Sequence, residues 1–191
     1  MDYVTKLLSG VVAGLVMVAS ALPAAAAGNG PLNTPLDAFT DGTPGRYLWT
    51  VPGVIKKNGF VTEFMCTNLD APGTVANIGV EVFDNTGTQL NNISVPPPAG
   101  GCNGAMLNVS AGSTVTISNG ATLQLHEDCI MGIGAFDNGS ARIVSTSSKI
   151  VCNALVADSQ NVVVNASGTT TGVSPAVSSL KVIKRSKQLG D

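Results

Sequence analysis

The chain has 191 residues, of which only 12% are charged and 4% aromatic, and its formal net charge at pH 7 is −2. A hydrophobic share of 44% can fill a core and excludes an intrinsically disordered chain, while the lack of a net positive charge disfavours a nucleic-acid-binding protein. The 22 glycines, together with abundant valine, threonine and asparagine, favour short β-strands and tight turns, so the sequence predicts an all-β protein.

Residues 1–27 have the pattern of a signal peptide. Lys6 lies in a short polar region, residues 7–22 are apolar or small, and residues 25–27 are three alanines that form a small-x-small cleavage site. The apolar stretch is also long enough to cross a bilayer, so an uncleaved anchor is the alternative. Cleavage is favoured because Pro23 precedes the alanines and no charged residue follows closely. We therefore expect a secreted bacterial protein with no membrane span after cleavage.

Residues 28–45 contain three prolines and four glycines. This composition predicts an extended, flexible arm ahead of the folded domain. The alternative is a strand donated to a neighbouring subunit, as in strand-addition polymers. The prolines weaken that alternative, because each one removes a backbone hydrogen-bond donor.

Residues 46–165 are predicted to form the folded domain. Two strand candidates, residues 46–55 and 60–69, flank Asn58-Gly59, the dipeptide most typical of a tight hairpin turn. Trp49, in the first of them, is expected in the core or at its edge. About eight or nine strands follow one another, with a turn signal roughly every 8–12 residues, and this spacing predicts an immunoglobulin-like β-sandwich.

Residues 75–83 show the clearest strand alternation in the chain. Ala76, Ile78, Val80 and Val82 share one face, and Asn77, Gly79 and Glu81 share the other. The pattern predicts a sheet with one face in the core and one in water. Further short strands are expected at residues 89–95, 105–109, 114–117, 122–125, 130–136, 141–145 and 150–156, with a turn at residues 137–140.

The four cysteines all lie after the signal peptide, and an even number in an exported chain predicts disulfides. Of the three possible pairings we favour Cys66–Cys152 with Cys102–Cys129. Cys66 and Cys152 lie in similar apolar strands, whereas Cys102 and Cys129 lie near loops. A zinc site is disfavoured because no Cys-x-x-Cys pair is present.

Residues 166–191 are predicted to be a low-complexity linker followed by a basic tail. Between residues 28 and 179, five basic residues face ten acidic ones, whereas the tail carries four basic residues against Asp191 alone. A tail of opposite charge can hold against its own domain, a neighbouring subunit, or anionic lipid or polysaccharide, and a solvated tail is the alternative. The candidate interaction residues are Lys181, Lys184, Arg185 and Lys187.

Few residues suggest chemistry. His126 is the single histidine, and on a strand it would share a face with Asp128. No Gly-x-Ser-x-Gly motif accompanies it, so a polar turn is favoured over a catalytic site. The turns at Asp84 and Asp137 resemble parts of calcium loops, but each offers one carboxylate where calcium needs several oxygen ligands. We expect no metal site, no cofactor and no catalytic residues.

These patterns favour a secreted, non-enzymatic structural or interaction protein at or beyond the bacterial cell surface. Self-assembly and an adhesin-like role are two versions of this function, with a second copy or another cell-surface molecule as the partner. The alternatives are an extracytoplasmic ligand-binding module and a hydrolase that uses His126 and Asp128.

Overall fold

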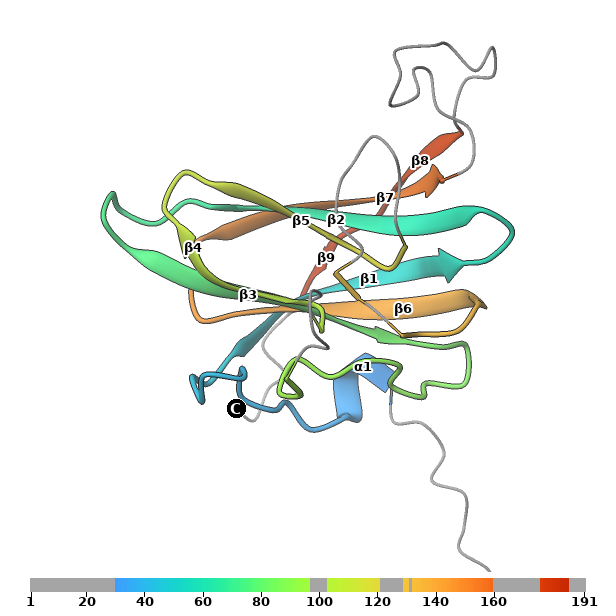
Figure 1. The fold of residues 1–191 in the computed structure, drawn as a ribbon, viewed down its shortest axis with the longest axis horizontal. Coiled ribbons are helices and arrows are strands. Elements are labelled where there is room, and N and C mark those ends of the chain that lie inside the picture. The colour runs from blue at the N-terminus through green and yellow to red at the C-terminus, as the bar shows by residue number, and fades with distance from the viewer. Residues whose placement is uncertain (1–29, 97–102, 121–128, 131, 160–175, 186–191) are drawn as a thin grey trace, which may run out of the picture.

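The computed structural model describes residues 30–96, 103–120, 129–130, 132–159 and 176–185. In this part of the chain two antiparallel β-sheets pack against each other (Figure 1), which confirms the prediction of an all-β sandwich. The five-stranded sheet has the order β4-β3-β6-β1-β9, and the four-stranded sheet has the order β5-β2-β7-β8. After a short helix α1 (Gly30–Asn33), the strands are β1 (Arg46–Lys56), β2 (Phe60–Asn68), β3 (Val75–Phe83), β4 (Ala105–Ser110), β5 (Thr114–Ser118), β6 (Phe136–Ser145), β7 (Ile150–Asp158), β8 (Val177–Leu180) and β9 (Ile183–Lys184).

The turn between β1 and β2 forms where the sequence predicts it. Asn58 has a φ of 55° and Gly59 a φ of 82°, and Lys57 and Phe60 form a backbone bridge across them. The predicted hairpin does not extend beyond this turn, because β1 belongs to the five-stranded sheet and β2 to the four-stranded sheet. The turn is therefore a corner that carries the chain from one sheet to the other.

The predicted turn at residues 137–140 lies inside β6. Asn138 has a φ of 55°, and a Cβ atom added to Gly139 would lie 2.4 Å from the backbone oxygen of Phe83. The register between β6 and β1 shifts at this end of the strand. These two turn-forming residues thus produce a bulge in a continuous strand instead of a chain reversal.

Other predicted strands have mixed outcomes. Residues 89–95 form no strand and contribute only an isolated bridge between Gln89 and Phe83. Ile130 likewise makes only an isolated bridge, with Asn103. Residues 122–125 lie outside the described part of the chain.

The main core lies between the two sheets. It is made of the inward-facing side chains of both, and Trp49 is partly buried against it as predicted. The pleat places alternate residues of each strand on this side. Representative fully buried members are Val51, Phe64, Ile78, Val80, Ile117 and Ile143.

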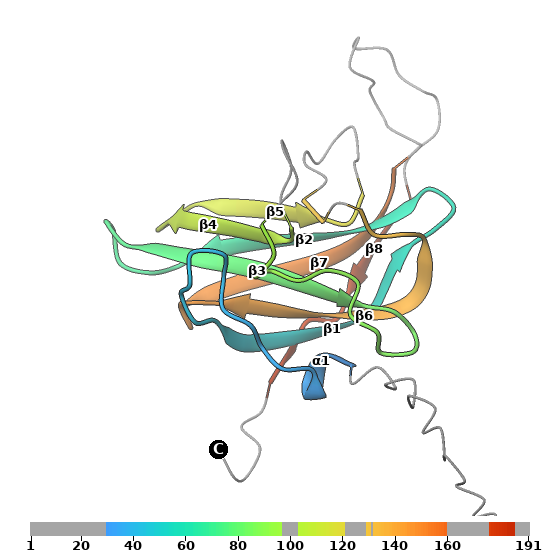
Figure 2. The same cartoon turned by 60° about the horizontal axis from the view of Figure 1, so that its bottom comes forward.

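The outer face of the five-stranded sheet is covered. All of β3 after Val75 is buried, including the polar face that was predicted to be in water. Residues 30–45, which we call the N-terminal clasp, lie below β3 and β6 in Figure 1 and cross in front of these strands in Figure 2. The structure places residues 30–45, predicted to form an extended and flexible arm, against this sheet, and no residue of the clasp is in a strand.

The C-terminal segment contains two short strands. β8 pairs with β7 at the edge of the four-stranded sheet, and β9 pairs with β1 at the edge of the five-stranded sheet. Leu180 and Val182 pack against the main core. The prediction of a linker and tail over residues 166–191 is thus wrong for residues 177–184, because these apolar side chains have a core to contact.

Candidate functional site

The predicted disulfide between Cys66 and Cys152 is confirmed. The two residues are directly opposite each other in the β2–β7 ladder, with their Cα atoms 4.1 Å apart, and both side chains belong to the main core. Cys129 is also disulfide-bonded, and its predicted partner Cys102 lies outside the described residues. The Cys66–Cys152 bond is structural, since its sulfur atoms are buried between the sheets.

The other predicted site residues are only partly within the described residues. His126, Asp128 and Lys187 lie outside the described residues. Lys181, Lys184 and Arg185 are exposed.

The visible part of the basic tail is attached to β1. Lys184 lies opposite Trp49 in the β1–β9 ladder. The backbone nitrogen of Arg185 donates to the oxygen of Leu48 at 2.9 Å, and the Arg185 guanidinium lies 5.1 Å from the centre of the Tyr47 ring. Two of the predicted interaction residues are therefore held on the domain itself.

A buried ion pair lies beneath the clasp. Glu81 on β3 and Arg142 on β6 are register partners on the outer face of the five-stranded sheet, and they are 0% and 1% exposed. Arg142 Nε donates to Glu81 Oε2, and Gln89 Nε2 donates to Glu81 Oε1 at 2.9 Å. Burial raises the pKa of Glu81, and the hydrogen bond and charge of Arg142 act in the opposite direction. The charge of Arg142 is thus fixed in place by the sheet.

The remaining nitrogens of Arg142 bind the backbone of the clasp. Nη1 donates to the oxygen of Thr34 at 2.6 Å and makes a longer contact with that of Pro31 at 3.4 Å, while Nη2 donates to the oxygen of Pro35 at 2.7 Å. The planar guanidinium can serve several acceptors at once. It also lies 5.4 Å from the centre of the Phe83 ring. Arg142 therefore recognises the carbonyl groups of a peptide segment rather than its side chains.

Phe39 anchors the other half of the clasp. Its ring is 2% exposed and packs in a second hydrophobic cluster with Ile93, Ala105 and Val144. A Cβ atom added to Gly79 would lie 3.1 Å from this ring. A glycine at this position of β3 leaves room for the close approach of the ring.

Polar side chains fix the middle of the clasp and its C-terminal part. Asn77 Nδ2 donates to Asp41 Oδ2 and to Thr43 Oγ1, both at 2.8 Å, and Asn92 Nδ2 donates to Asp37 Oδ2 at 2.7 Å. Hydrogen bonds from Thr43 and then Asn77 hold the pKa of Asp41 below its ordinary value. The sheet surface beneath the clasp, which we call the groove, thus combines an apolar site for an aromatic ring, a carbonyl-binding cation and amide donors. Such a set is suited to holding an extended peptide segment.

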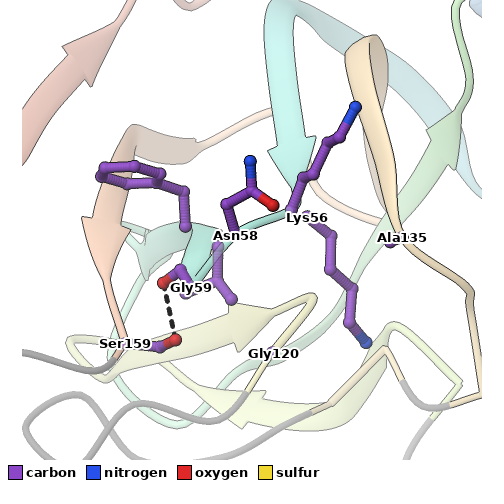
Figure 3. Close-up of a pocket in the computed structure, with 9 residues that line it drawn as sticks. Lys56, Asn58, Gly59, Gly120, Ala135 and Ser159 are labelled. Carbon is purple, nitrogen blue, oxygen red and sulfur yellow. Dashed lines mark hydrogen bonds between the residues drawn. The ribbon is translucent and has the colours of Figure 1, made fainter.

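A separate surface pocket of about 350 Å³ lies at the corner between β1 and β2 (Figure 3). Within it, Ser159 Oγ donates to the backbone oxygen of Gly59 at 2.6 Å. Two lysines, Lys56 and Lys57, line the pocket, and Lys57 Nζ is paired with Asp137 Oδ2 at 2.6 Å. The lining residues are Lys56, Lys57, Asn58, Gly59, Phe60, Val61, Gly120, Ala135 and Ser159.

Sequence patterns alone do not identify the residues of the groove as a binding surface. The available signal was Glu81 in residues 75–83 and Arg142 in residues 141–145, the only charged side chain in each of these two predicted strands. Such lone charges in buried strands are expected to pair.

The turn at Asp84, which resembles part of a calcium loop, has an ordinary turn geometry. Asp84 Oδ1 accepts hydrogen bonds from the backbone nitrogens of Thr86 and Thr88.

The described residues were also compared with the requirements of a metal site and of a membrane-spanning helix. Among the described residues there is no group of three or more potential metal ligands. In the same part of the chain, no helix has the length and apolar character needed to span a membrane. Comparison of the chain with protein-family models, with curated proteins and with solved structures finds no match.

Proposed function

We propose that this protein is an exported, non-enzymatic structural or interaction protein that acts at or beyond the bacterial cell surface. The observation that carries the proposal is the groove on the five-stranded sheet, where buried Arg142 binds the backbone oxygens of Thr34 and Pro35. A buried cation that recognises main-chain carbonyls is a device for joining polypeptide segments. Main-chain hydrogen bonds with one side-chain pocket are a common mode of peptide recognition.

Export is supported by two features. Residues 1–27 carry the pattern of a signal peptide, and the Cys66–Cys152 disulfide suits an oxidising compartment. We extend the proposal to an immunoglobulin-like architecture, which the two packed antiparallel sheets support. Antibody domains place their disulfide between the two sheets, whereas Cys66 and Cys152 belong to one sheet, so the likeness concerns architecture alone.

The test is to express the full chain with its own leader in a bacterial host and to locate the product. We expect the product in the medium, in the periplasm or on the cell surface, with the Cys66–Cys152 bond formed. Protease added to intact cells distinguishes the surface from the periplasm, because it reaches only the surface. A variant with Leu15→Arg in the apolar stretch should stay in the cytoplasm. A wild-type product that remains cytoplasmic and reduced would overturn the proposal.

A ligand-binding module is the second candidate, and the pocket near Lys56 favours it. An ammonium group beside a surface cavity suits an anionic ligand such as an acidic polysaccharide. Calorimetry with polygalacturonate as the probe should show binding that Lys56→Ala weakens and Lys149→Ala, a change of an exposed lysine on another loop, leaves intact. Equal binding by all three proteins would remove this candidate.

A further inference from the structure

We infer that the N-terminal clasp is exchangeable, and that its partner is the groove of a second copy of this chain. The inference rests on the proposed function, because it names the partner of the same groove. In the exchanged form, residues 30–39 of one copy would make with its neighbour the contacts that they make within one chain here. The contacts between residues 30–39 and the groove are thereby kept, while the turn bonds of Phe39 with Thr43 and Gly42 open.

Few groups hold the clasp. Of residues 30–44, only Phe39 is buried, and the other side chains are partly or fully exposed. The other side-chain attachments are the bonds to Arg142, Asn77 and Asn92. The backbone nitrogen of Gly30 also donates to the oxygen of Gly87, and partly buried Leu36 packs against the Phe39 cluster. Release of the clasp therefore leaves the main core between the two sheets undisturbed.

The connection between clasp and domain is built as a hinge. Residues 40–44 are all exposed, and Gly42 has a φ of 80° in a turn closed by the backbone bonds of Phe39 with Thr43 and of Gly42 with Phe39. β1 begins directly after this segment, at Arg46. The clasp can swing out through rotations in these exposed residues once the bonds from Asn77 to Asp41 and Thr43 open. Exchange of a terminal element through such a hinge is a low-cost route to a dimer.

An empty groove is unfavourable, and this drives its refilling. Without the clasp, the cluster of Ile93, Ala105 and Val144 loses Phe39, and the guanidinium of Arg142 loses the carbonyl oxygens it binds. A groove vacated by its own clasp is complementary to the clasp of another copy. The balance between closed and exchanged forms then depends on protein concentration and on the geometry of the hinge.

Two of the four edge strands in the described part of the chain, β8 and β9, are less suited to self-association. β8 has four residues and β9 has two, and Lys181 and Lys184 lie beside or within them. Short edge strands and lysines are devices that prevent edge-to-edge pairing. The groove therefore offers a specific contact between copies where these two edges do not.

The first experiment traps the exchange. Asp37 and Asn92 are hydrogen-bonded across the clasp and the groove, so the full chain with Asp37→Cys is mixed at high concentration with the full chain with Asn92→Cys and then oxidised. We expect a covalent dimer whose linked peptides, identified by mass spectrometry, join positions 37 and 92. The matched control pairs Asp37→Cys with Thr114→Cys, an exposed position on the four-stranded sheet. The product with position 92 should exceed the control product severalfold.

The second experiment changes the hinge without adding a cysteine. Deleting residues 40–42 shortens the turn so that the clasp cannot reach its own groove, and we expect the mass measured by light scattering to double. Thr40→Ala, which keeps the length, should behave as the wild type. An unchanged monomer after the deletion overturns the inference.

The outcomes separate the inference from the proposed function. Oligomers that form without a link between positions 37 and 92 overturn the exchange and leave an exported interaction protein. Retention of the wild-type chain in the cytoplasm overturns the proposed function, whatever the cross-linking shows with purified protein. A 37–92 product above the control supports the exchange.

Discussion

The outer faces of the two sheets differ at the end of the four-stranded sheet where Thr67 and Val151 pair, although Glu63, farther along the same face, is 0% exposed. On the five-stranded sheet, Glu81 and Arg142 point outward and are nevertheless buried, because the clasp covers them. On the four-stranded sheet, Val151 points outward with 48% exposure, and the Thr67 and Thr114 hydroxyls lie 2.7 Å apart in an exposed pair. Strand alternation alone does not decide which outward-facing residue is wet. The exposure also depends on whether a segment distant in the sequence covers the face. The clasp covers Glu81 and Arg142 and keeps them from solvent, whereas Val151 remains exposed.

The largest effect is expected from Arg142→Ala. The change leaves the buried Glu81 without its cation and the clasp carbonyls without their donor, so the free energy of unfolding should fall by about 3–5 kcal/mol. Chemical denaturation measures it, and Lys149→Ala, an exposed lysine, should stay within about 0.5 kcal/mol of wild type. The double change Arg142→Met with Glu81→Leu should cost less than Arg142→Ala. A loss as small as that of the lysine variant would show that the covered face contributes little.

Phe39→Ala tests the cover itself. Removing the ring leaves a cavity beside Ile93 and Val144, and we expect a loss of about 3 kcal/mol together with faster proteolysis within residues 30–45. Leu32→Ala is the matched control, since Leu32 is 59% exposed and should change stability by less than about 0.5 kcal/mol. Equal protease resistance of the two variants would contradict the role of Phe39 as an anchor.

The open face should tolerate change. Val151→Thr keeps the β-branched shape and adds a hydroxyl in solvent, so the free energy of unfolding should move by less than about 0.5 kcal/mol. The contrasting change on the covered face is Val144→Thr, which buries a hydroxyl beside Phe39 and should cost about 1–3 kcal/mol. Similar effects of the two changes would remove the difference between the faces.

The smallest effect concerns an exposed ion pair outside both faces. The hydrogen bond and charge of Lys57 hold the pKa of Asp137 below its ordinary value. Because the folded-state pKa is lowered, this pair stabilises the protein above the ordinary pKa of an aspartate, and the contribution is lost as pH falls through the folded-state value. Lys57→Ala should raise the pKa of Asp137 in an NMR titration. A pKa that stays the same would show that the pair is open in solution.

Strands, turns and the disulfide that depend on short stretches of sequence could be predicted correctly. The alternation in β3, the positive-φ pair Asn58-Gly59 and the similar strands around Cys66 and Cys152 led to correct strands, a correct turn and a correct disulfide. Each of these depends on a few neighbouring residues or on a matched pair of strands.

The parts that failed depend on contacts between distant segments. Nothing near Pro35 in the sequence indicates that its carbonyl meets Arg142, and so the clasp was expected to be flexible. Asn138-Gly139 has the composition of a turn, but pairing with β1 keeps it in a strand as a bulge. The contacts between clasp and groove could not be predicted because they join segments that are distant in the sequence.

The position of the Cys66–Cys152 bond also has a mechanical consequence. The bond joins β2 to β7 and closes the interval between two cysteines that are 86 positions apart. A pulling force applied to the two ends of the chain would pass through this covalent link, and the closed interval could not lengthen. The clasp and the strands β8 and β9 lie outside the interval and would yield first, so tension would detach the covering segments while β3, β4, β5 and β6 stayed linked.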